Sequence, residues 1–206
     1  MVVLPVFLQA PWVRLHPFSA TLFTAVLLAV GIVLEQSGER QKAEIGQLLV
    51  GFSGSWLAGC LFWGWLRAHP LLHLPVEAFA LPLALTGLNS RWRLAAAFYL
   101  SSLLGTACTD LMMAVTGVMK AWPTVVMAPI DVAPGLLHQA GLQLLHPLPM
   151  LLLALAAALI LGLGRRWSQM GSTWTMAGAV LVTTVWVDGL FLITALLQPG
   201  LSGLIE

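Results

Sequence analysis

Residues 69–82, H-P-L-L-H-L-P-V-E-A-F-A-L-P, decide how the chain is organised. The stretch lies between two long apolar segments and combines one carboxylate, Glu77, with three prolines, at Pro70, Pro75 and Pro82. A proline fits the first turn of a helix, where its missing N–H has no partner to lose. The topology of every later segment depends on whether this stretch crosses a membrane or enters it and returns on the same side.

Glu77 is the residue of this stretch whose surroundings matter most. With Pro75 in the first turn, Glu77 lies near the positive end of the helix dipole, which favours a carboxylate. In one interpretation Glu77 marks a helix start at the membrane interface, in contact with water. In the other it points into a bundle and pairs with Arg67, His73 or another helix, because an intramembrane acid without a partner costs about 2.5–3.5 kcal/mol. Pro75 argues against a helical face shared by His73 and Glu77.

The composition indicates an integral membrane protein. Of 206 residues, 59% are apolar and 8% are charged, whereas soluble domains carry about 25% charged residues. The apolar residues fall in runs near the length of about 20 residues that spans a hydrocarbon core. We therefore predict an all-α fold, a polytopic membrane helix bundle that forms a single domain over residues 1–206. The formal net charge of +1 gives no basic field for nucleic acid, so the expected surroundings are the lipid bilayer.

About six hydrophobic segments are predicted. The third is short and rich in proline, and from residue 75 to 88 a helix would be about 20 Å long, less than the core of about 30 Å. A re-entrant loop is therefore the alternative to a crossing, although such a loop needs protein around its irregular backbone. The predicted spans cover residues 17–34, 46–66, 71–89, 94–119, 149–164 and 174–197.

Two shorter elements are predicted outside these spans. Residues 1–16 are too short to cross a membrane and are interpreted as an interfacial anchor with Trp12 at headgroup depth. Residues 131–146 are predicted as an interfacial amphipathic helix, with one side apolar and the other polar. This helix lies either on the membrane surface or over the mouth of the bundle.

The positions of Lys and Arg do not decide the orientation. With six crossings, six of the nine basic residues share one side of the membrane, which places both termini outside the cytoplasm. With five crossings the division is again six against three, and the N-terminus moves inside. Sequence alone leaves both topologies open.

Polar faces on the fourth and sixth segments predict an internal site. Ser102, Thr106 and Asp110 follow one another at intervals of four residues, as do Thr184 and Asp188, so each set shares one helix face. An intramembrane acid is a candidate functional residue, because a partner or water must meet its cost; the alternative is a structural polar seam. If Asp110 and Asp188 share an interior, one is protonated or both meet a cation. The candidate intramembrane polar site consists of Glu77, Asp110, Asp188, Ser102, Thr106 and Thr184.

The second segment carries a stripe of small residues. Gly51, Ser55 and Gly59 recur every four residues, a spacing predicted to serve helix packing. The alternative is backbone clearance for a flat ligand such as a pigment. The cofactor is left unknown.

No catalytic residues and no metal ligands are predicted. The sequence lacks HExxH, GxSxG and P-loop motifs. Asp110 follows Cys-Thr and Asp188 follows Trp-Val, so neither has the Gly-x-Gly-Asp context of diaspartyl intramembrane proteases. The two cysteines have no metal-ligand spacing. An intramembrane enzyme is therefore the least favoured class.

The chain resembles an uncharacterised family of cyanobacterial integral-membrane proteins, domain of unknown function 3120. The stretches that carry the likeness are LPVFLQAPWVRL, GFSGSWLAGCLFWGWLR, HLPVEAFALP, FYLSSLLGTACTDL and VDGLF. They touch most of the chain, although residues 120–170 contribute nothing. The resemblance supplies no catalytic residues. It implies a cyanobacterial source, a thylakoid or plasma membrane, and a photosynthesis-linked role.

Two functions are compatible with these patterns. The favoured one is a non-enzymatic accessory or assembly component of a membrane complex that handles pigment, with other membrane-protein subunits as partners. Nine tryptophans, the small-residue stripe and the lack of catalytic motifs motivate it. The alternative is a small solute-binding or transport component, similar in size and segment number to the substrate-binding subunits of vitamin transporters. Its acidic intramembrane site would be the polar set named above.

Overall fold

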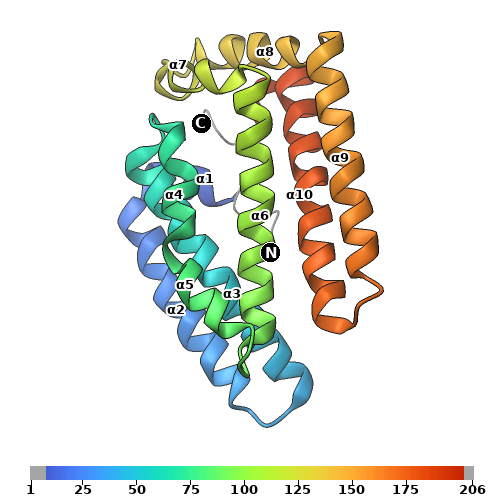
Figure 1. The fold of residues 1–206 in the computed structure, drawn as a ribbon. Coiled ribbons are helices and arrows are strands. Elements are labelled where there is room, and N and C mark those ends of the chain that lie inside the picture. The colour runs from blue at the N-terminus through green and yellow to red at the C-terminus, as the bar shows by residue number, and fades with distance from the viewer. Residues whose placement is uncertain (1–7, 202–206) are drawn as a thin grey trace.

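The structure is a computed structural model that describes residues 8–201, and in that range it consists of helices joined by turns and loops (Figure 1). Six helical segments in it are long and apolar enough to cross a membrane, which confirms the predicted all-α polytopic bundle. The first seven residues of the predicted N-terminal anchor lie outside the described range. The six segments are Pro17–Glu35, Arg40–Leu66, Pro70–Gly87, Arg93–Val115, Pro147–Trp167 and Ser172–Leu197.

Most of these segments are single helices, and the third is not. The long helices are α2 (Pro17–Glu35), α3 (Arg40–Leu61, continued by a π-helical turn over Phe62–Leu66), α6 (Arg93–Val115), α9 (Pro147–Trp167) and α10 (Ser172–Leu197). The third segment consists of the 3₁₀ turn Pro70–Leu72, α4 (His73–Glu77), the 3₁₀ turn Ala78–Ala80 and α5 (Leu81–Gly87). Shorter elements are α1 (Ala10–Leu15), α7 (Trp122–Met127), α8 (Ala133–Leu144) and the 3₁₀ turns Val118–Lys120 and Pro199–Leu201.

Helix α6 stands in the middle of the bundle (Figure 1). It packs against α3 and α5 on one side and against α10 on the other, and α9 packs on α10. Helix α2 packs on α3 as an antiparallel hairpin. Helices α7 and α8 lie across one end of α6, α9 and α10 (Figure 1). The polar faces of α6 and α10 are thereby brought together with α4.

The second helix begins earlier than the predicted boundary at residue 46. Helix α3 starts at Arg40, directly after a turn in which Gly38 adopts a φ of +77°. Its first turns carry an ion pair between Arg40 Nε and Glu44 Oε1 at 3.0 Å, four residues apart. Such pairs support a helix end in water. Hydropathy alone places these charged residues in a linker, because it does not detect a helix that extends beyond the membrane.

The third segment is divided into short helical pieces, each of which carries a proline or follows one that does. Pro70, Pro75 and Pro82 each lie in the first turn of a separate helical piece, where their missing N–H groups break no helical hydrogen bond. The pieces change from 3₁₀ to α-helix and back within eleven residues, 70–80. The segment predicted to be short and rich in proline is thus a succession of short helical turns.

Helix α1 packs into the bundle through aromatic contacts. The ring of Trp12 lies 5.2 Å from that of Phe23 and 5.8 Å from that of Trp56, measured between centroids. Val13 is fully buried, and the indole N–H of Trp56 donates to the carbonyl of Ala20 at 2.9 Å. The anchor interpretation of residues 1–16 did not anticipate these contacts with α2 and α3, because nothing in a short apolar run indicates its neighbours.

Glycines set the closest helix approaches. A Cβ built on Gly178 of α10 would lie 2.7 Å from the carbonyl oxygen of Gly164 in α9. A Cβ on Gly46 of α3 would lie 2.4 Å from that of Gly31 in α2. Small residues let helix backbones approach in this way in membranes, where hydrophobic burial supplies no drive for association.

Candidate functional site

A cavity of about 210 Å³ lies between α3, α4, α6 and α10, and we call it the polar cavity. It occupies the half of the bundle nearer to α7, whose Trp122 contributes to its wall. The structure places every member of the candidate intramembrane polar site on its lining. These residues are Glu77 from α4, Ser102, Thr106 and Asp110 from α6, and Thr184 and Asp188 from α10.

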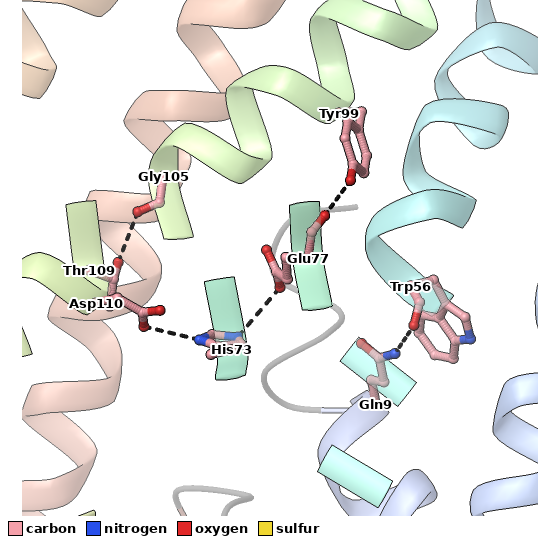
Figure 2. A network of polar contacts seen from close by, with 8 residues as sticks. All are labelled: Gln9, Trp56, His73, Glu77, Tyr99, Gly105, Thr109 and Asp110. Carbon is pink, nitrogen blue, oxygen red and sulfur yellow. Dashed lines mark hydrogen bonds and ion pairs between the residues drawn. The ribbon is translucent and has the colours of Figure 1, made fainter. Parts of the chain in front are cut away.

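His73 connects two of the three carboxylates (Figure 2). Its Nδ1 lies 3.0 Å from Asp110 Oδ1, and its Nε2 lies 3.5 Å from Glu77 Oε1. The ring stacks on Phe62, with centroids 4.2 Å apart. The expectation that Pro75 prevents a helical face shared by His73 and Glu77 is wrong, because Pro75 lies inside the single α-helical turn His73–Glu77 without interrupting it.

The contacts of His73 determine how many protons Glu77, His73 and Asp110 must share. A neutral imidazole carries one N–H and a protonated one carries two. Two carboxylate contacts therefore require either a protonated ring or a proton on one of the acids. The arrangement Glu77–His73–Asp110 can hold one proton more than a neutral ring between two ionised acids, and it links α4 to α6.

Tyr99 of α6 holds the next part of the third segment. Its hydroxyl donates to the backbone carbonyl of Glu77 (Figure 2) and accepts from the backbone N–H of Ala80 at 3.2 Å. Glu77 is the last residue of α4 and Ala80 the last residue of the 3₁₀ turn that follows, so the two backbone groups lie at either end of that turn. The hydroxyl thus supplies hydrogen bonds at a break in the helix and keeps the carboxylate of Glu77 near α6.

Asp188 is bound by a residue outside the predicted set. Its Oδ2 lies 2.6 Å from the hydroxyl oxygen of Thr109 on α6. That hydroxyl also lies 3.2 Å from the carbonyl of Gly105 (Figure 2), and its one hydrogen serves one acceptor at a time. A Cβ on Gly105 would lie 2.4 Å from Thr184 Cγ2, so the glycine allows α10 to come close. Thr109 is one position off the face of Asp110, and only the crossing of α6 and α10 gives it a role.

Gln9 is a second lining residue that sequence reasoning missed. Its Nε2 donates to the carbonyl of Trp56 at 2.5 Å (Figure 2) and lies 3.1 Å from Cys60 Sγ. Its Oε1 is fully buried and has no hydrogen-bond partner within the described residues. A Cβ on Gly59 would lie 2.6 Å from this oxygen, so α3 leaves room for the amide at that point. Nothing in the pattern of residues 1–16 indicates that Gln9 turns inward.

The small-residue stripe of α3 has three different surroundings. Gly51 meets α6, since a Cβ there would lie 2.5 Å from the carbonyl oxygen of Ala95. Ser55 lines the polar cavity. Gly59 also lines it and adjoins Gln9. The N-terminal part of the stripe, at Gly51, therefore closes against a helix, and the C-terminal part, at Ser55 and Gly59, borders the cavity.

The polar cavity combines an excess of acids with aromatic walls. Three carboxylates line it against the single imidazole of His73, and none of the Lys or Arg side chains of residues 8–201 does so. Within that same range, no group of three or more His, Cys, Asp or Glu residues is arranged to hold a metal ion. The aromatic lining consists of Phe52, Phe62, Trp63, Phe98, Trp122 and Phe191. Acids beside aromatic faces attract an organic cation.

Comparison with known proteins identifies a family. Neither a curated protein nor a solved structure matches the chain. A family described as "Protein of unknown function (DUF3120)" matches residues 1–196, which includes all the residues of the polar cavity. The chain belongs to this family of unknown function.

Proposed function

We propose that the chain is a solute-binding or transport component of a membrane, and that it binds a small protonated amine in the polar cavity. The observation that carries this proposal is the convergence of Glu77, Asp110 and Asp188 on one cavity in which His73 is the only basic side chain among residues 8–201. The polar-seam alternative predicts carboxylates whose oxygens are all taken up by neighbouring helices. Asp188 is instead exposed within the described chain and has one hydrogen bond, from Thr109.

Charge balance favours a cationic ligand. Two ionised carboxylates close together are costly in a poorly hydrated site, and a bound cation lowers that cost. His73 contacts Glu77 and Asp110, and within the described part of the chain Asp188 has a hydrogen bond from the Thr109 hydroxyl and no contact with a basic group. A ligand ammonium group near Asp188 and Asp110 supplies the missing positive charge, and the aromatic walls add cation–π attraction.

The size of the cavity limits the ligand. Its volume of about 210 Å³ exceeds the roughly 150 Å³ that suffices for benzene and falls below the 300 Å³ or so where drug-sized pockets begin. Benzylammonium, a benzene ring with an aminomethyl group, is therefore a suitable probe. Benzyl alcohol has a similar shape and no charge.

Binding to the purified chain in lipid nanodiscs tests the proposal. Calorimetry should show saturable binding of benzylammonium and binding at least tenfold weaker for benzyl alcohol. Asp110→Asn and Asp188→Asn should each weaken amine binding about tenfold, which corresponds to 1.4 kcal/mol. Asp131→Asn, an exposed acid outside the cavity, is the matched control and should leave the affinity unchanged. Equal affinity for amine and alcohol, or full affinity in both cavity variants, would end the proposal.

An accessory or assembly role is the second candidate. It is supported by a separate open cavity of about 580 Å³ between α2, α3, α5 and α6, which includes the small residues Gly51, Ser53, Gly54, Ala84, Ala95 and Ala96. Such a lining suits a transmembrane helix of another subunit. Under this candidate the chain serves a photosynthesis-linked complex of a cyanobacterial thylakoid or plasma membrane. Affinity purification from mildly solubilised membranes tests it, and recovery of the chain without protein partner or pigment would count against it.

A further inference from the structure

A second cavity, of about 270 Å³, adjoins the polar cavity, and we call it the apolar cavity. It lies between α6, α8, α9 and α10. Its lining is almost entirely hydrocarbon and thioether, with Met112 from α6, Leu137 from α8, Leu153 and Ala157 from α9, and Leu192 from α10. Leu137 is buried, so the apolar side of α8 forms an end wall of this cavity.

The two cavities share part of their walls. Thr109, Met113, Trp122, Asp188 and Phe191 line both. Asp188 lines both cavities, and this residue is exposed within the described chain, so it lies at the boundary between the two cavities. An acid and its hydroxyl partner therefore stand where a polar compartment passes into an apolar one.

We propose that the ligand is a single-chain amphiphilic amine, with its ammonium group in the polar cavity and its hydrocarbon chain in the apolar cavity. This inference rests on the proposed function and names the class of molecule. An ordinary phospholipid fits less well, because its phosphate would meet Glu77, Asp110 and Asp188. A cation with no phosphate satisfies the acids, and a flexible chain matches walls of Met, Leu and Ala.

The position of the ligand's hydrocarbon chain in the protein, rather than the length of that hydrocarbon chain, is the informative property. A hydrocarbon chain that moves from lipid into the apolar cavity gains little hydrophobic free energy, because both surroundings are apolar. Affinity referred to the membrane is therefore not expected to rise steeply with chain length. The chain's position can be read directly by photocrosslinking.

The probe is dodecylammonium with a diazirine at the far end of its hydrocarbon tail, added to the purified protein in nanodiscs. Crosslinks, mapped by mass spectrometry, should concentrate on cavity residues of α8, α9 and α10 such as Leu153 and Leu192. Excess benzylammonium should reduce these crosslinks at least fivefold, because it occupies the site of the ammonium group. Dodecanol with the same diazirine should give no crosslinks that benzylammonium displaces.

Two substitutions on α9 form a matched pair. Ala157→Phe fills the apolar cavity, and Ala158→Phe places the same side chain at an exposed neighbouring position outside it. Ala157→Phe should lower the displaceable crosslinks at least fivefold and leave benzylammonium affinity unchanged, which also reports that the protein is folded. Ala158→Phe should alter neither measurement.

Failure of this inference can be told apart from failure of the proposed function. In one outcome, benzylammonium binds while crosslinks spread over outward residues such as Leu155 and Leu159 and are not displaced by it. That result would contradict the amphiphilic ligand and would support the binding of a small amine in the polar cavity. The wild-type crosslink map gives this answer even if Ala157→Phe does not fold. If benzylammonium does not bind and the dodecanol probe marks the apolar cavity as strongly as the amine probe, both are wrong, and the cavity is a lipid groove.

Discussion

The third and fifth spans are both peripheral, yet they are attached to the bundle in opposite ways. In each, 6% of the residues in the most apolar window are buried. The fifth span is the uninterrupted helix α9, and it approaches α10 at Gly164 and Gly178. The third span is a series of short turns, and polar contacts attach it to α6 at Asp110 and Tyr99.

This difference shows what each kind of attachment allows. Close backbone packing needs only small residues, so α9 carries no acid. Polar attachment needs partners at defined positions, because donors and acceptors without partners are costly in a membrane. The same groups that hold the third span are then available to a ligand. A site at this end of the bundle therefore follows from the polar contacts that hold the third span.

The largest expected effect is on the polar attachment. His73→Ala removes the ring between Glu77 and Asp110 and should cost on the order of 3 kcal/mol, the loss typical of breaking a buried charged contact. Thermal unfolding in detergent, followed by a thiol-reactive dye that reports exposure of the buried Cys60, measures it.

His69→Ala is the matched control. His69 belongs to the same region, is exposed, and should change stability by less than about 0.5 kcal/mol, as surface substitutions usually do. Equal effects of the two substitutions would show that His73 does not hold the third span.

The packing attachment should respond to added volume. Gly178→Leu places a side chain against the backbone of Gly164 and should destabilise by about 1–3 kcal/mol, the usual cost of overpacking. Gly162→Leu on α9 meets nothing within 4 Å and should not destabilise. The same dye assay compares them, and benzylammonium affinity should be unaffected by Gly162→Leu. A neutral Gly178→Leu would contradict the close contact of α9 and α10.

The smallest effect is expected at the break in the third span. Tyr99→Phe removes the hydroxyl that serves the Glu77 carbonyl and the Ala80 N–H, which should cost about 1 kcal/mol. Hydrogen–deuterium exchange of the Ala80 N–H should become faster. Ser101→Ala is the control, because that hydroxyl donates within its own helix, to Ala97 O at 2.7 Å. Unchanged hydrogen–deuterium exchange of the Ala80 N–H in Tyr99→Phe would show that the Tyr99 hydroxyl does not help to hold the third span.

Much of the fold could be predicted because its signals are local. Length and hydropathy located the six segments that are long and apolar enough to span a membrane, and the proline positions indicated an irregular third one. The four-residue spacing of Ser102, Thr106 and Asp110 predicted one polar face, since a helix repeats every 3.6 residues. The start of α3 at Arg40 was missed because a helix continues into water where hydropathy no longer marks it.

The sequence by itself therefore determined an all-helical membrane bundle and the helix faces on which Asp110 and Asp188 lie. Only the tertiary structure decided that these faces meet, that His73 stands between Glu77 and Asp110, and that Thr109 binds Asp188. The inward turn of Gln9 likewise appears only in three dimensions. The physical reason is that periodicity is set along one helix, whereas the neighbour that a face meets depends on how distant helices cross and on the close approach that glycines such as Gly105 permit.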